Sequence, residues 1–270
     1  MIWWPDSVPT LVSGTTTLRP MRPTDADDIY RCAQDPEVPR FTTLPDQYPM
    51  DLAISFARER NVISFENKTE IVFVVEDSRL VGRPVTELID AQFAKLFTKL
   101  DTEGASSASS VPSTSSTSST SYTSSTSSTS TTSTASTAST AQVKYQISDE
   151  RLAEINKYAS DNKDIVSSGF AGVISLHSIN IPNHRAEIGY WFATEARNQG
   201  IGTKAAEMIT EYGLMTMGFR RIEGLADATN EGSKKLLLNA GYQLEGILKQ
   251  YVTRRDGRQI DMALLAATPK

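Results

Sequence analysis

The sequence predicts an α/β (α+β) fold in which a mixed, mostly antiparallel twisted sheet is flanked by helices. Three observations predict it. Strand-like runs of alternating apolar residues recur along the chain, stretches with helical apolar spacing separate several of them, and two pairs of these runs are joined by short turns, as in hairpins. A helical and disordered insertion is expected between the second and third core strands.

Local patterns place each expected element in chain order. Before the insertion we expect a strand at 15–20, a helix from Asp25 capped by Thr24, a helix near 51–60 and a strand at 70–75. After it we expect a hairpin of 170–178 and 185–192, a helix at 204–217, a strand at 221–226 and a helix at 230–239 ended by Gly241. The last pair, 243–253 and 259–266, forms a hairpin about Asp256-Gly257.

The insertion, residues 78–165, is expected within a single domain of residues 8–268. Between Ser106 and Thr140, 29 of the 35 residues are Ser or Thr, too little apolar surface to offset the entropy of ordering, so 105–141 is expected to be disordered. The alternatives for this segment are a phosphorylatable tether, a functionless expansion and a glycosylated stalk. The stalk requires a secretory route. Helical spacing on both sides, at 85–100 and 152–158, predicts two helices that pack together.

Composition limits the classes of partner and compartment. Hydrophobic content of 39% over 270 residues is enough for a core, and the net charge of −5 comes with no basic block, which disfavours nucleic acid as a direct partner. Cys32 is the sole cysteine and His177 and His184 are the only histidines, so we expect no disulfide and no metal site. We also expect no membrane partner, because no run of about 18 apolar residues occurs. The expected location is the cytoplasm, with the nucleus as alternative.

The segment from Arg197 to Thr203 is the most informative motif. It joins a strand-like run to a helix-like run, and Gly200 and Gly202 allow a tight turn in which several backbone amides converge on one anion. The order of residues excludes a Walker A loop, and the missing third glycine excludes a dinucleotide fingerprint. A diphosphate cradle and an empty strand-to-helix turn remain the alternatives.

Three segments together resemble the GNAT superfamily of acyl-CoA N-acyltransferases, especially its ribosomal-protein N-terminal acetyltransferase-like (Rim-type) branch. They are Arg197-x-x-Gly200-x-Gly202, the strand 185–191 (Arg-Ala-Glu-Ile-Gly-Tyr-Trp), and Asn230-x-x-Ser233 followed by Ala-Gly-Tyr-x-x-Glu-Gly at 240–246. The resemblance covers most of the chain except the insertion. It implies acetyl-CoA as acyl donor and a primary amine as acceptor.

The resemblance also implies the coenzyme site. The diphosphate is expected on the turn, with Arg197, Asn198, Gln199, Gly200, Ile201, Gly202 and Thr203. The pantetheine arm is expected along the preceding strand, with Ile188, Tyr190, Trp191 and Phe192. Asn230 and Ser233 are expected to reach the coenzyme from the next helix, although Asn230 is also a residue type that favours a helix N-cap.

For catalysis, Glu187 is the expected general base, with a salt bridge to Arg185 as the alternative role and His184 as an outside candidate. The tyrosine that many relatives use to protonate the thiolate is replaced by Leu237, so Ser233 and Tyr251 are the candidate acids, with cofactor contact and packing as their alternative roles.

The expected function is therefore direct acetyl transfer to a primary amine in a ternary complex. The acceptor is a protein N-terminus or a small molecule, such as an aminoglycoside, a polyamine or an amino acid. The alternative is a catalytically inactive acyl-CoA binder or scaffold. A monomer or a homodimer is expected.

Overall fold

The computed structural model describes residues 2–92 and 148–269, and within them one eight-stranded sheet runs in the order β1-β2-β3-β4-β5-β6-β8-β7. Its strands are β1 Leu11–Ser13, β2 Thr16–Arg19, β3 Ile71–Asp77, β4 Phe170–Asn180, β5 Arg185–Phe192, β6 Arg221–Asp227, β7 Gln243–Thr253 and β8 Gln259–Ala267. All neighbours are antiparallel except β5 and β6. This confirms the predicted mixed sheet, including both hairpins, and the insertion does separate β3 from β4.

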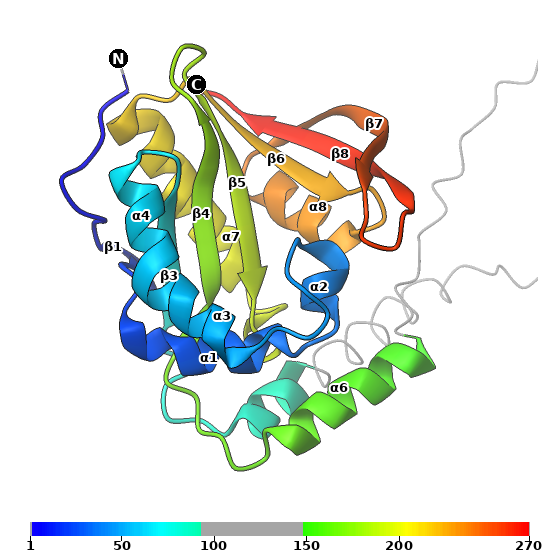
Figure 1. Cartoon of the computed structure of the whole chain (residues 1–270). Helices are drawn as coiled ribbons and strands as arrows, with labels where there is room; N and C mark the ends of the chain where they lie inside the picture. Colours follow the sequence, from blue (N-terminus) through cyan, green and yellow to red (C-terminus); the bar gives the residue numbers. More distant parts are fainter. Residues whose placement is uncertain (1, 93–147, 270) are drawn as a thin grey trace, which may run out of the picture.

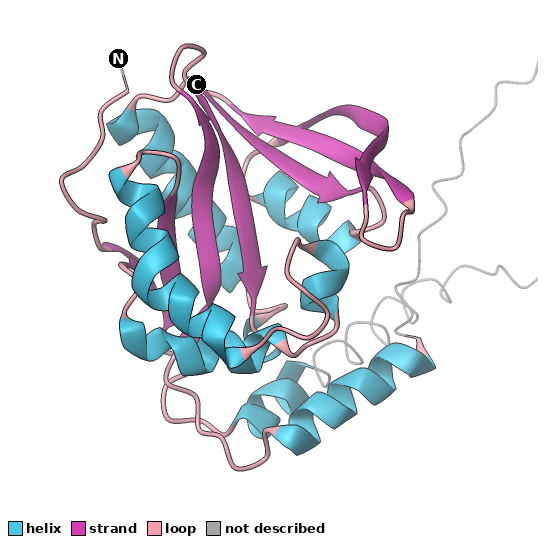
Figure 2. Cartoon of the chain, viewed as in Figure 1, coloured by secondary structure: helices cyan, strands magenta, loops and turns pink. Residues whose placement is uncertain are grey.

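Helices cover both faces of the sheet (Figures 1 and 2). One face carries α1 Ala26–Ala33, α3 Met50–Ser55 and α4 Asn61–Glu66, with α2 Glu37–Phe41 beside them, and the other carries α7 Ile201–Glu211 and α8 Glu231–Asn239. Strands β3 and β4 are buried between these layers, and Phe73, Ile174 and Leu176 are fully enclosed. Apolar residues therefore run continuously along β3 instead of alternating.

The ladder between β5 and β6 is short, and the candidate functional site lies where the two strands stop pairing. The parallel register joins Arg185 to Arg221 and ends at Glu187 with Glu223, after which the strands diverge (Figure 1). In the described part of the chain, residues 188–192 thus have a strand partner on the β4 side only.

The predicted cap of the first helix is wrong. The chain enters α1 through a 3-10 turn, Pro23–Asp25, and neither Thr24 nor Asp25 caps α1 through its side chain. Instead the Asp25 carboxylate accepts hydrogen bonds from the Arg22 amide (2.6 Å) and from two nitrogens of buried Arg19 (2.7 and 2.8 Å). A charged partner six residues away therefore determines how this turn forms.

The helix expected near 51–60 is longer than predicted, and two short elements were not anticipated. The helical run extends from Met50 to Glu66 through a wider π turn at Phe56–Arg60. The side-chain amide of Asn61 donates to the carbonyls of Phe56 (2.8 Å) and Ala57 (2.9 Å), and the backbone N–H of Asn61 also donates to Phe56, which closes the wide turn. The elements β1 and α2 span only three and five residues, too few for a periodic signal.

The two helices beside the Ser/Thr-rich tract do pack together. A helix at 85–92 and α6 Asp149–Asp161 share a small core of their own, formed by Val85, Ile89, Ile155 and Tyr158. Both lie below the end of the sheet at which β5 leads into α7 (Figure 1). The predicted continuation of the first helix to residue 100, and the predicted disorder at 105–141, lie outside the described residues.

Candidate functional site

The turn before α7 presents free backbone amides. Gly200 caps the helix in the left-handed conformation (φ 78°) and Asn198 is also left-handed (φ 56°). The first hydrogen bond of the helix runs from the Lys204 amide to the Gly200 carbonyl (3.0 Å), so the amides of Ile201, Gly202 and Thr203 lie ahead of it. No side chain caps this helix end. The N–H groups and the positive end of the helix dipole are therefore available to an anion.

The two glycines of the turn serve different purposes. A Cβ at Gly200 would meet no heavy atom within 4 Å, so the space above the turn is open. A Cβ at Gly202 would lie 2.7 Å from Leu236 of α8 and 2.9 Å from the Phe192 ring of β5. Gly202 thus allows α7 to pack closely on both neighbours, while Gly200 supplies the left-handed turn and leaves room for a ligand.

The side chains of Arg197 and Gln199 hold the turn from within. Arg197 donates two hydrogen bonds to the Phe192 carbonyl (2.8 and 3.0 Å), and its remaining Nη1 lies 2.8 Å from Asp35 and 2.9 Å from Glu37. Gln199 donates to the Glu195 carbonyl (2.6 Å). The predicted coenzyme residues of this segment therefore face an anion chiefly through their backbone.

The carboxylate of Asp35 is almost fully buried beneath this turn. Burial opposes its ionisation, but the charges of Arg197 and Arg151, together with hydrogen bonds from Arg151 and Thr194, outweigh this effect. They hold the pKa of the Asp35 carboxyl well below its usual value, so the group is ionised at neutral pH.

The diverging strands β5 and β6 form the second part of the site. Ile188 and Phe192 are buried, while Tyr190 and Trp191 are partly exposed. Leu237 of α8 is 1% exposed and packs where the strands separate, because Gly224 of β6 has no side chain there and a Cβ would lie 2.6 Å from Leu237. From residue 188 onward β5 has no strand partner on this side, although its last carbonyl, that of Phe192, accepts from Arg197, and the edge leads through the 3-10 turn Thr194–Ala196 to the glycine turn.

Residues of α8 border the same edge. The Asn230 side chain accepts a hydrogen bond from the Ser233 amide (3.0 Å), so Asn230 caps α8, as one of its two expected roles requires. The Ser233 hydroxyl lies 2.8 Å from the Tyr190 hydroxyl. Burial raises the pKa of Tyr190 well above its usual value, against the lowering effect of this hydrogen bond, so the phenol stays neutral.

Glu187 has no ion pair with Arg185, the alternative expected from strand alternation. Arg185 instead binds Glu223 on β6 at 2.9 Å. Glu187 lies opposite His177 in the β4–β5 register, and the His177 ring covers Gly189, where a Cβ would lie 2.7 Å from Nε2. The pair Glu187 and His177 is therefore adjacent to the edge of β5, whereas His184 lies in the turn before β5.

Tyr251 lies apart from this group. It is on β7 at the edge of the sheet, with 55% of its surface exposed, and that strand pairs with β8. Its predicted role as an acid stays a prediction.

A cavity of about 500 Å³ opens on the face of the sheet that carries α1 and α3. It was not anticipated from the sequence, because its walls come from distant segments: Ile29, Thr43, Leu44, Tyr48, Phe56, Arg60, Thr69, Glu70, His177, Ser178 and Trp191. The only available signal was strand alternation, which places His177 and Trp191 on one face. Trp191 therefore borders the cavity with its side chain and the open edge with its backbone.

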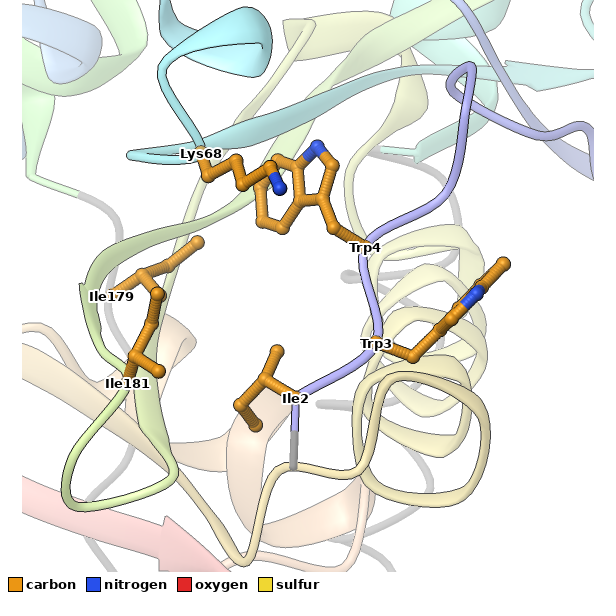
Figure 3. A pocket seen from close by; sticks show the side chains of 6 residues that line it. All are labelled: Ile2, Trp3, Trp4, Lys68, Ile179 and Ile181. Carbon is orange, nitrogen blue, oxygen red and sulfur yellow. The ribbon is translucent and has the colours of Figure 1, made fainter.

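A smaller, mainly apolar hollow of about 280 Å³ lies at the β4–β5 turn, where Ile179 and Ile181 meet the N-terminal segment and Lys68 (Figure 3). The Trp4 ring packs against Phe65, with ring centroids 5.4 Å apart, while Trp3 is turned outward. This hollow is at the opposite end of β5 from the glycine turn.

Two absences among the described residues, 2–92 and 148–269, bear on other functions. These residues contain no helix long and apolar enough to cross a membrane. They also contain no group of three or more His, Cys, Asp or Glu side chains arranged to hold a metal ion.

A glycine turn that follows an open strand edge suits an extended ligand that contains a diphosphate. The chain matches the family described as acetyltransferase (GNAT) domain over residues 15–94 and 117–243. It belongs to this GNAT family. The predicted family and fold are thereby confirmed.

Similar proteins agree with this assignment. The chain is 34% identical over 92 residues to the uncharacterized N-acetyltransferase YoaA of Bacillus subtilis, which covers 34% of this chain and 49% of YoaA. It is 35% identical over 79 residues to the ribosomal-protein-serine acetyltransferase of Escherichia coli, which covers 29% of this chain and 44% of that protein. The chain thus spans about half the length of the curated relatives it matches.

Solved structures show the same fold. The ribosomal L7/L12 acetyltransferase RimL, solved with coenzyme A, superposes with a TM-score of 0.57 at 13% identity, covering 97% of each chain. The microcin C7 self-immunity acetyltransferase MccE, solved with acetyl-CoA and AMP, has a TM-score of 0.56 at 15% identity, covering 95% of this chain and 94% of MccE.

Proposed function

We propose that this chain is an acetyl-CoA-dependent N-acetyltransferase that transfers the acetyl group to a primary amine. One observation carries the proposal: the unpaired edge of β5 leads, through the short 3-10 turn Thr194–Ala196, to a turn at Gly200 where the first amides of α7 precede its first hydrogen bond and a Cβ would meet no atom within 4 Å. An extended amide-containing arm fits the edge as an added strand would, and a diphosphate fits the helix N-terminus. Acetyl-CoA has both parts in this order, and its thioester supplies the reactive acetyl group.

The acceptor amine is proposed to enter through the 500 Å³ cavity, on the face of the sheet that carries α1 and α3. Glu70 offers a negative charge to an incoming ammonium group, and the Trp191 ring offers a π face. Trp191 borders both the cavity and the open edge of β5. The acetyl donor on the edge and the acceptor amine in the cavity would therefore meet at this strand. This arrangement supports direct attack in a ternary complex, without a covalent enzyme intermediate.

Proton transfer is assigned to the residues around this meeting point. An amine must lose its proton before it attacks a thioester, and Glu187, opposite His177, is the proposed base, acting directly or through water. Ser233, hydrogen-bonded to the neutral Tyr190 phenol, is the proposed donor to the departing sulfur. A thiol with a pKa of about 8.5 is an adequate leaving group as its thiolate. Turnover is therefore compatible with Leu237 in place of a tyrosine.

The acceptor class is proposed from the relatives. The names of the similar proteins include a ribosomal-protein-serine acetyltransferase and spermidine N(1)-acetyltransferase, both of Escherichia coli. We favour a protein N-terminus as acceptor, with a polyamine as the second candidate. The cytoplasm, or the nucleus, is the proposed location, and the chain is proposed to act as a monomer or homodimer.

The coenzyme assignment is tested with the pair Gly200→Asp and Gly200→Asn. The two residues have nearly the same size, both tolerate the left-handed conformation, and the space around Gly200 is open. We expect Gly200→Asp to raise the Kd for coenzyme A, measured by calorimetry, at least tenfold more than Gly200→Asn, because its carboxylate repels the diphosphate. Equal effects would contradict a diphosphate at this turn.

Turnover is tested by thiol release from acetyl-CoA in the presence of peptide N-termini and, separately, spermidine. Release with either acceptor class supports the enzyme. Tight coenzyme binding without release on any amine would instead indicate the inactive acyl-CoA binder.

A further inference from the structure

The insertion contacts the segment that leads into the glycine turn. This segment contains a 3-10 turn, Thr194–Ala196, between β5 and Arg197. Gln92, at the end of the helix 85–92, donates a hydrogen bond of 2.7 Å to the Thr194 carbonyl, with both residues buried. The Tyr158 hydroxyl of α6 lies 3.5 Å from the carboxylate of Glu195, which is itself fully buried. Both described helices of the insertion therefore support the approach to the turn.

A chain of ion pairs forms a second connection. Arg151 of α6 lies 3.1 Å from Asp35 and 3.0 Å from Glu37. Arg197 lies 2.8 Å and 2.9 Å from the same two carboxylates. The other nitrogens of Arg197 hold the Phe192 carbonyl, at the end of β5. Arg151 is thus linked through two shared carboxylates to the residue that joins β5 to the turn.

The charges explain why Arg151 matters for this geometry. Two carboxylates share two guanidinium groups, and the side chains of Arg151 and Asp35 are 14% and 2% exposed. Without Arg151, Arg197 is the one guanidinium left, among the described residues, to pair with both carboxylates, although Asp35 keeps its hydrogen bonds from Thr194 and from the Glu37 amide. A guanidinium drawn further toward the carboxylates loses its alignment with the Phe192 carbonyl. Each amide of the turn then shifts relative to the edge of β5.

We propose that Arg151 is a positioning residue, through which the insertion sets the geometry of the coenzyme turn. The inference rests on the proposed function, because it takes coenzyme A to be the ligand of the turn. By linkage, the coupling is reciprocal: an insertion that favours coenzyme binding is itself held more firmly when the coenzyme is bound.

The test compares Arg151→Met, Arg151→Lys and Lys157→Met in the full chain. Lys157→Met is the matched control, because it removes an exposed ion pair, with Asp161, from the same helix. We expect Arg151→Met to raise the Kd for coenzyme A and the KM for acetyl-CoA about tenfold while kcat at saturation changes less than twofold. Arg151→Lys should recover most of the affinity, and Lys157→Met should bind like the unaltered chain.

Hydrogen exchange supplies the reciprocal measurement. We expect coenzyme A to slow amide exchange across residues 149–161 in the unaltered chain, and to do so less in Arg151→Met. If Arg151→Met does not fold, Arg151→Gln replaces it, since it keeps a hydrogen-bond donor but removes the charge that Asp35 and Glu37 share, and a threefold or greater rise in Kd is expected.

Three outcomes would overturn the inference. Equal coenzyme affinity of the folded Arg151→Met variant and the unaltered chain would remove the role of Arg151 and leave the proposed function intact. If Arg151→Gln has to stand in, an unchanged Kd has the same meaning. Failure of the unaltered chain to bind coenzyme A would instead overturn the proposed function, and this inference with it.

Discussion

Gly202→Ala is the sharpest perturbation of the site. The added methyl group would lie 2.7 Å from Leu236 and 2.9 Å from Phe192, about 1 Å inside normal carbon contact. Overpacking of this kind costs about 2–3 kcal/mol, of which the better helix propensity of alanine returns at most about 1 kcal/mol. The net loss of about 1–3 kcal/mol predicts a Tm lower by about 2–12 °C. Because α7 must move away from β5, the Kd for coenzyme A should rise about tenfold.

The control is Gly232→Ala, at the same position in α8. Both glycines are the second residue of their helix, but a Cβ at Gly232 would make an ordinary contact of 3.5 Å with Asn230. This variant should be neutral or more stable by up to about 1 kcal/mol. Thermal unfolding followed by circular dichroism, and calorimetry with coenzyme A, measure the two effects. A Gly202→Ala protein with an unchanged or higher Tm and unchanged affinity would refute the packing argument.

Three further predictions concern single groups. Glu187→Gln should lower kcat by about 10²-fold or more with little change in coenzyme affinity, as expected for loss of a general base, and a kcat within threefold of the original would exclude that role. Tyr190→Phe removes the hydrogen bond to Ser233 and should lower kcat about tenfold. The same substitution in a Ser233→Ala background should have no further effect on kcat. An undiminished effect there would show that the two hydroxyls do not act as a pair. Asp35→Asn should cost about 1.5–3 kcal/mol of unfolding free energy in urea, because two guanidinium groups lose a buried charged partner while they keep Glu37. Since the folded pKa of Asp35 is lowered, its contribution is complete above its unfolded pKa of about 3.9 and is lost as the pH falls below about 4. The urea midpoint of the unaltered chain should therefore fall more steeply below that pH than the midpoint of Asp35→Asn.

Local patterns were sufficient to predict the hairpins, the glycine turn and every strand of the sheet except the three-residue β1. Alternating apolar residues, the Asp256-Gly257 pair and the spacing of Gly200 and Gly202 all act over a few residues, and the structure contains the corresponding elements. Asn230 was likewise predictable as a cap, because the residue type favours that position.

Interactions between distant segments explain what the sequence did not predict. Strand alternation placed Arg185 beside Glu187, but Glu223 arrives on the neighbouring strand and binds Arg185 instead. Thr24 has the right residue type for a cap, yet buried Arg19 draws Asp25 into a different turn. The cavity on the face of α1 needs Tyr48 and His177 together, and only the folded sheet brings them close.

The early end of the β5–β6 ladder divides the sheet into two parts that share only three pairs of residues, Arg185 to Glu187 with Arg221 to Glu223. A ligand lying between the diverging strands would bridge these parts and complete the missing row of hydrogen bonds. The free energy of unfolding should then rise with ligand concentration, by about 2.7 kcal/mol at a hundred times the Kd.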